Sequence, residues 1–129
     1  MEIKPTYVTW EQAKLFKEKG SNIKVKTFFD LLSNTQINDA PLGNYNLTKQ
    51  SVSIPEQWQV VEWLRINYGI WISIQIGHDE NKVWYNVYLE KIELTYEFEP
   101  INNDFDIGGD TPQEAYSAAF DYILNKNLI

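Results

Sequence analysis

The chain has no cysteine among its 129 residues, and its longest apolar run is far shorter than the roughly 20 residues of a membrane-spanning helix. The lack of cysteine excludes disulfides and thiolate chemistry and is compatible with a reducing compartment. Residues 1–5 contain no apolar signal-peptide core. We therefore expect a cytoplasmic protein that does not interact with a membrane.

Sequence motifs of common catalytic and cofactor sites are missing as well. There is no glycine-rich phosphate loop, dinucleotide fingerprint, zinc-ligand cluster or Gly-x-Ser-x-Gly elbow. His78 is the only histidine, and its polar neighbours are typical of a turn. We expect no cofactor, no metal and no enzymatic activity, although the lack of a motif does not by itself exclude catalysis.

The segment from Asp104 to Asp110 resembles the start of a calcium-binding loop. An EF-hand loop that began at Asp104 would need a glutamate at position 115, where the chain has Ala115. It would also need a preceding helix, where the pattern favours a strand. We therefore expect no dedicated calcium site.

The length and the charge distribution limit the class of protein. A chain of 129 residues favours one domain, spanning 1–129, with a single core. The net charge of −7 is uneven, because residues 1–30 carry six lysines against four acids and residues 90–121 carry nine acids against Lys91 alone. This acidic segment disfavours direct binding to nucleic acid and favours a basic protein partner.

The clearest structural signal is a helix that leads directly into a strand. Ser53 and Glu56 match a capping box, Pro55 suits a first helical turn, and Gly69 suits a left-handed stop. Apolar residues recur at helical spacing before Gly69 and alternate after it. We predict a helix over 55–68 and a strand over 70–76.

Two further helices carry their own start signals. Thr9 and Gln12 match a capping box before a helix over 10–19, and Gly20 suits its end. Thr111, Pro112 and Glu114 occupy the preferred N-cap, N1 and N3 positions of a helix over 112–125.

Alternating patterns predict the other strands. These lie near 23–30, 82–89 and 91–98, and the change of phase at Glu90 indicates a bulge or short turn. Residues 33–52 are polar and form either a long loop or a segment with a short strand. The predicted fold class is α+β: a single domain in which a mainly antiparallel sheet of about four strands is covered by three helices.

Aromatic residues make up 15% of the chain, with five tryptophans and eight tyrosines. The predicted hairpin would carry several of them on the face opposite its isoleucines: Trp71, Trp84 and Tyr88. Large exposed apolar patches are uncommon on monomers, so helices or a partner should cover this face. The sequence leaves open whether these aromatic residues belong to the core or to an interface, and whether the protein forms homo-oligomers.

Three segments carry a resemblance to known proteins: residues 7–14, residues 55–65 with Gly69–Ile72, and residues 112–124. The sequences of these segments resemble those of a family of small uncharacterised proteins that are frequent in bacteriophages and related mobile elements. The resemblance covers about half of the chain. It implies a phage context and carries over no activity and no catalytic residue.

Charge and resemblance together suggest a non-enzymatic interaction protein, phage-encoded, that binds and inhibits a basic host or phage protein such as a CRISPR or other defence nuclease. The predicted partner-binding face is acidic, and strand spacing would place its carboxylates about 6.5 to 7 Å apart, as phosphate mimics. It comprises Glu90, Glu93, Glu97, Glu99, Asp104, Asp106 and Asp110. A merely solvated acidic face explains the same residues.

The alternative hypothesis is a small-ligand-binding module or minor enzyme. Its aromatic pocket would be lined by Trp71, Trp84, Tyr85 and Tyr88, whose rings could stack on a base or a sugar.

Overall fold

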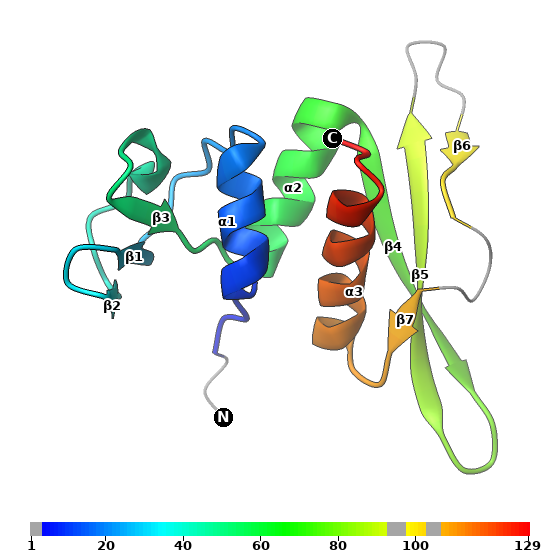
Figure 1. Cartoon of the computed structure of the whole chain (residues 1–129). Coiled ribbons are helices and arrows are strands. Elements are labelled where there is room, and N and C mark those ends of the chain that lie inside the picture. Colours follow the sequence, from blue (N-terminus) through cyan, green and yellow to red (C-terminus); the bar gives the residue numbers. More distant parts are fainter. Residues whose placement is uncertain (1–3, 93–97, 103–106) are drawn as a thin grey trace. The chain divides into compact units, whose positions relative to one another are not determined.

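The computed structural model describes residues 4–92, 98–102 and 107–129 (Figure 1). Within these residues it contains three α-helices and two antiparallel sheets, so the α+β class is confirmed. The elements follow one another in the order α1 (Trp10–Glu18), β1 (Phe28–Asp30), β2 (Thr35–Ile37), the 3-10 helix η1 (Tyr45–Leu47), β3 (Ser51–Ser53), α2 (Gln57–Tyr68), β4 (Ile70–His78), β5 (Val83–Ile92), β6 (Phe98–Pro100), β7 (Gly108–Gly109) and α3 (Pro112–Asn125).

The contacts within the chain group it into two compact units, residues 1–60 and 61–129. Helix α2 begins in the first unit and continues into the second. The prediction that the whole chain forms one domain stays a prediction.

The first unit contains a small antiparallel sheet with the strand order β2-β1-β3. The predicted strand over 23–30 is shorter than expected, because β1 covers only its last three residues. Val25 instead forms an isolated bridge with Gly43. The polar segment 33–52 contains β2, η1 and the start of β3, so of the two alternatives the one with a short strand is correct.

Helix α1 begins as the sequence predicts. The Thr9 hydroxyl accepts a hydrogen bond from the backbone N–H of Gln12 at 3.2 Å, and the Gln12 side chain accepts one from the N–H of Thr9 at 3.0 Å. Gly20 follows the helix with a φ of +81°. The helix packs against β3 and buries Phe16 and Ala13. Local capping and an apolar stripe therefore fix this helix on its sheet.

Helix α2 begins differently from the prediction. Ser53 is part of β3, and its hydroxyl accepts a hydrogen bond from the N–H of Tyr45 at 3.0 Å. The side chain of Gln59 accepts a hydrogen bond from the N–H of Glu56 at 3.0 Å, and the helix starts at Gln57. The predicted Ser53–Glu56 capping box is wrong because that serine is used by the strand and by η1. The equivalent contact, from a side chain to the backbone N–H three residues earlier, is made by Gln59 and Glu56.

The second unit is built on the predicted hairpin. β4 and β5 pair in register from Ile70 opposite Lys91 to His78 opposite Val83. The ladder runs through Glu90 without interruption, so the predicted bulge is absent and β5 extends to Ile92. β6 and β7 pair with the other edge of β5, and residues 93–97 of the predicted strand 91–98 lie outside the described part.

One face of this sheet forms the core of the second unit. Val87 and Leu89 are fully buried there, and α3 packs against β4, β5 and β7 (Figure 1). On the helix side, α3 contributes four buried side chains to this core: Ala115, Ala119, Phe120 and Ile123. Full burial of side chains such as Leu, Ile or Phe stabilises the fold by about 1.5–3 kcal/mol each.

Candidate functional site

The predicted acidic face lies only partly in the described structure. Four of its seven members, Glu93, Glu97, Asp104 and Asp106, lie outside the described residues. Glu90, Glu99 and Asp110 are described; the strand register gives the faces of Glu90 and Glu99, and Asp110 follows β7.

The three described acids do not share one face. Glu90 lies opposite Trp71 on β4, whereas Glu99 lies opposite Lys91, the next residue of β5. Because successive strand residues alternate between the two faces of a sheet, Glu90 and Glu99 lie on opposite faces. Asp110 forms an exposed ion pair with Lys82 at 3.1 Å, a kind of contact that contributes little stability. A single acidic face stays a prediction that depends on the other four residues.

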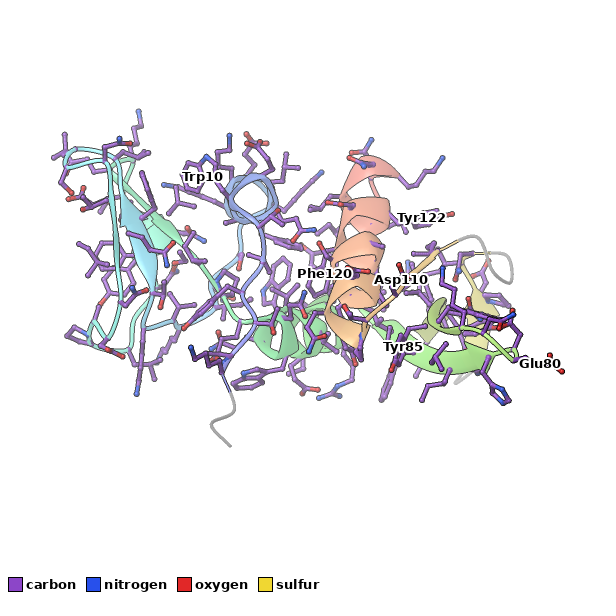
Figure 2. All side chains as sticks on the ribbon, turned by 90° about the horizontal axis from the view of Figure 1, so that it is seen from below. Trp10, Glu80, Tyr85, Asp110, Phe120 and Tyr122 are labelled. Atoms are coloured by element: carbon purple, nitrogen blue, oxygen red, sulfur yellow. The ribbon has the colours of Figure 1, made fainter. Side chains whose placement is uncertain are left out.

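Negative charge is concentrated in the second unit as a whole. Residues 1–60 carry seven lysines against six acids, whereas residues 61–129 carry twelve acids against four basic residues. Glu80 points outward from the tip of the β4–β5 hairpin (Figure 2). The exposed acids of this unit within the described residues are Glu62, Asp79, Glu80, Glu99, Asp110, Glu114 and Asp121.

The hairpin places three of the predicted aromatic residues on one face. Trp71, Trp84 and Tyr88 share a face by register, whereas Tyr85 lies opposite Ile76 on the other. Trp71 and Trp84 are also separated by six strand positions, about 20 Å. These four side chains therefore do not surround a single pocket.

Trp71 contacts a charged pair at the end of α2. The Arg65 guanidinium lies 5.3 Å from the centre of the indole ring and donates a hydrogen bond to Glu62 at 2.7 Å. That hydrogen bond, together with the positive charge of Arg65, lowers the pKa of Glu62, and the same bond with the negative charge of Glu62 raises the pKa of Arg65. Trp71 is 41% exposed, so this cluster is part of the surface.

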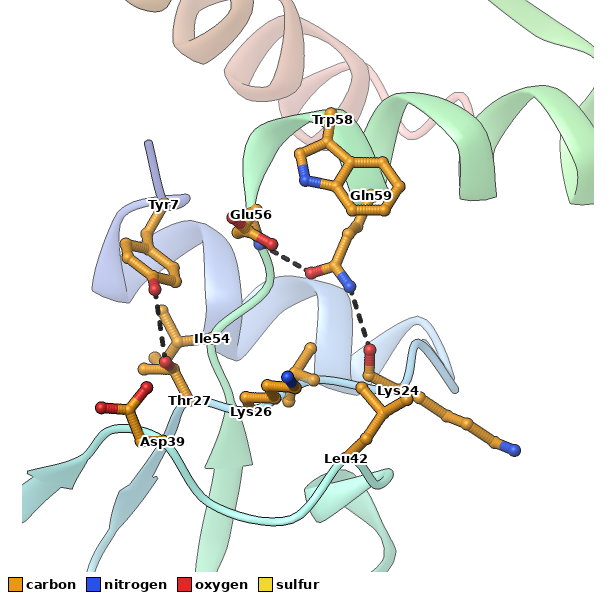
Figure 3. Close-up of a pocket in the computed structure, with 11 residues that line it drawn as sticks. Tyr7, Lys24, Lys26, Thr27, Asp39, Leu42, Ile54, Glu56, Trp58 and Gln59 are labelled. Atoms are coloured by element: carbon orange, nitrogen blue, oxygen red, sulfur yellow. Dashed lines mark hydrogen bonds between the residues drawn. The ribbon is translucent and has the colours of Figure 1, made fainter. Parts of the chain in front are cut away.

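The first unit contains a pocket that the sequence did not predict. It has a volume of about 510 Å³, and its rim includes Tyr7 and the 63% exposed Trp58 (Figure 3). The side chain of Gln59 fixes one wall, because it donates a hydrogen bond to the carbonyl of Lys24 at 3.0 Å while accepting one from Glu56. The Thr27 hydroxyl lies 3.5 Å from the hydroxyl of Tyr7.

The charges around this pocket are balanced. Lys24 and Lys26 contribute two positive charges, and Asp39 and Glu56 two negative ones. The residues that line it include no histidine and no cysteine, so no nucleophile is paired with an imidazole base there. The pocket is suited to binding a neutral or zwitterionic molecule with an apolar part that can stack on Trp58.

Among the described residues, no three His, Cys, Asp or Glu side chains gather closely enough to hold a metal ion. None of the helices in the described ranges combines the length and the apolar character that crossing a bilayer requires. Comparison with protein-family models finds no match to this chain, and neither do comparisons with curated proteins and with solved structures.

Proposed function

We propose that the protein is a non-enzymatic interaction protein whose acidic second unit binds a basic protein partner. The division of charge supports this proposal, since residues 61–129 contain twelve acids against four basic residues while the first unit is nearly neutral. A concentrated negative field attracts a positively charged surface and accelerates its association.

The partner in this proposal is a protein with a basic nucleic-acid-binding channel, such as a CRISPR effector or another defence nuclease. The phage context implied by residues 7–14, 55–65 and 112–124 motivates that choice, and the interaction that we propose takes place in the cytoplasm of the host cell. The exposed acids at the hairpin tip and on β6, which include Glu80 and Glu99, are suited to a channel that otherwise holds phosphates.

Affinity capture from host lysate over a series of salt concentrations tests the proposal. We expect capture of a basic protein that weakens as salt rises, because screening reduces attraction between exposed charges. Simultaneous reversal of Glu93, Glu97 and Glu99 to lysine should abolish capture. The matched control reverses Glu2, Glu11 and Glu18, which changes the net charge by the same amount in the first unit and should leave capture intact. Equal losses in both variants, or capture that is insensitive to salt, would contradict the proposal.

A small-ligand function is the second candidate, and the pocket of the first unit favours it. Tyr7 and the exposed Trp58 flank the pocket as stacking platforms would. A ligand of this site should raise the melting temperature of the protein and should lose that effect in a Trp58→Ala variant. Charge reversal in the second unit should leave this ligand effect unchanged, which separates the two functions.

A further inference from the structure

β4 is an edge strand over its whole length. The sheet of the second unit has the order β4-β5-β6, and β7 also pairs with β5. Within the described part of the chain, β4 therefore pairs with β5 alone and has a second side without a neighbouring strand.

Two hydrogen bonds show which backbone groups face that open side. The N–H of Ile92 donates to the carbonyl of Gly69 at 2.9 Å, and the N–H of Asp79 donates to the carbonyl of Lys82 at 2.9 Å. Because hydrogen-bonded pairs recur at every second residue of an antiparallel ladder, the odd-numbered residues of β4 face β5. The outward-facing N–H and carbonyl groups belong to Ile70, Ile72, Ile74, Ile76 and His78.

The open edge carries few of the features that keep edge strands from pairing. No charged residue and no proline lies between Ile70 and Gly77, and the ladder with β5 has no bulge. Ile76 is 67% exposed. Natural edge strands are usually protected by lysine, proline, bulges or a short length, and an unprotected apolar edge is a site where another strand adds.

We propose that a second copy of this chain pairs with β4 in an antiparallel arrangement about a two-fold axis at Ile74, which joins the two sheets into one. The outward-facing residues run from Ile70 to His78 and are centred on Ile74. Pairing about that residue sets Ile74 opposite its own equivalent and Ile72 opposite Ile76 of the second copy. Every outward-facing position then meets another outward-facing position, as an isologous interface requires.

A second copy fits this edge better than a basic segment of another protein. β4 has no carboxylate between Ile70 and Gly77, so the strand itself has no charge with which to select a basic neighbour. The copy offers an edge of the same length and sets isoleucine against isoleucine. The two acidic units repel each other, so dimerisation should strengthen as salt rises. Capture of a basic partner has the opposite salt dependence.

Sedimentation of the full chain over a range of concentrations tests the proposal. We expect a concentration-dependent dimer whose dissociation constant rises roughly tenfold or more in an Ile76→Pro variant. The N–H that proline removes faces away from β5, so the β4–β5 ladder remains complete, and Ile76→Val serves as the control that keeps the N–H. A chain that is monomeric at about 100 μM, or a dimer that is unchanged in Ile76→Pro, would overturn the proposal.

Single cysteines test the register even if the proline variant fails to fold. The chain has no cysteine of its own, so Ile72→Cys, Ile74→Cys and Ile76→Cys each introduce one thiol. Directly opposite residues have Cα atoms about 5.5 Å apart, which a disulfide can span, whereas the equivalents of residues 72 and 76 would be separated by about 13 Å. We expect disulfide-linked dimers only with Ile74→Cys. Cross-linking at position 72 or 76 instead, or at none of the three, rules out the proposed pairing.

Discussion

The indole ring of Trp84 occupies the space directly over Gly77, its partner on the neighbouring strand. A Cβ atom built on Gly77 would overlap the indole Nε1 and Cε2 atoms and would lie 2.9 Å from Cζ2. The backbone of Gly77 is not in the left-handed region, so glycine is required here by space and not by conformation. The Trp84 ring on β5 therefore fills the space that a side chain at position 77 of β4 would need.

Replacing Gly77 by alanine should therefore destabilise the hairpin. Because the Trp84 ring has to move to admit the new methyl group, we expect a loss of about 1–3 kcal/mol in the free energy of unfolding. Denaturation followed by tryptophan fluorescence measures both the loss and the change around the indole. Gly43→Ala is the control, since its nearest contact would be an ordinary 3.7 Å and we expect a change below about 0.5 kcal/mol. Equal stability of the two variants would show that the ring moves at no cost.

Gly69 ends α2 for two separate reasons, and a pair of variants can separate them. Its φ is +66°, and an added Cβ would lie 2.9 Å from the carbonyl oxygen of Ile92. Gly20 has a φ of +81° and no atom within 4 Å of the added Cβ. We expect Gly20→Ala to cost about 1 kcal/mol, the conformational part alone, and Gly69→Ala to cost about 1–3 kcal/mol more. Chemical denaturation of both variants measures the difference, and equal losses would show that the carbonyl of Ile92 is not a steric limit.

The hydroxyl of Thr111 should stabilise the start of α3. It accepts a hydrogen bond from the N–H of Glu114 at 3.1 Å, and the Glu114 carboxylate accepts one from the N–H of Asp110 at 2.8 Å. Thr111→Ala leaves the first of these donors without its partner, so we expect a loss of about 1 kcal/mol in the free energy of unfolding. Thr111→Ser keeps the hydroxyl and should stay near the stability of the natural chain. Hydrogen exchange at the Glu114 amide should accelerate only in the alanine variant, and identical exchange in both would contradict the assigned cap.

Local signals in the sequence predicted the three helices and the β4–β5 hairpin. The caps at Thr9 and Thr111 and the stop at Gly69 depend on residues within one helical turn, and the structure contains all three. The alternation after Gly69 predicted the hairpin because one of its faces packs against α3 and buries Ile70, Val87 and Leu89. The predicted cap at Ser53 is wrong because of a contact outside the helix. The Ser53 hydroxyl accepts a hydrogen bond from the N–H of Tyr45, eight positions earlier, in a segment whose structure was not predicted.

Features that depend on distant segments could not be predicted from the sequence in the same way. The pocket of the first unit combines Tyr7, Lys26 and Trp58, which lie far apart in the chain and share no spacing. The edge position of β4 follows from the pairing of β6 and β7 with β5, and sequence periodicity does not give strand order. Charge was visible in the sequence, but the face on which Glu90 or Glu99 lies depends on the strand register.

Lys17 should stabilise the first unit through two backbone carbonyl groups. Its ammonium group donates hydrogen bonds to the carbonyls of Thr48 and Ser51, the second at 2.7 Å, and so ties α1 to the segment that leads into β3. Lys17→Met keeps most of the side-chain length but removes both hydrogen bonds, and we expect a loss of about 1–3 kcal/mol in the free energy of unfolding.

The matched control for Lys17 is another lysine of the same helix. Lys14 forms an exposed pair with Glu11 at 3.0 Å, so Lys14→Met should cost less than about 1 kcal/mol. Urea denaturation compares the two variants, and hydrogen exchange over residues 48–53 should accelerate with Lys17→Met alone, because the charged donor holds that backbone in place. Equal losses in the two variants, with unchanged exchange, would mean that the contacts of Lys17 contribute no more than an ordinary surface ion pair.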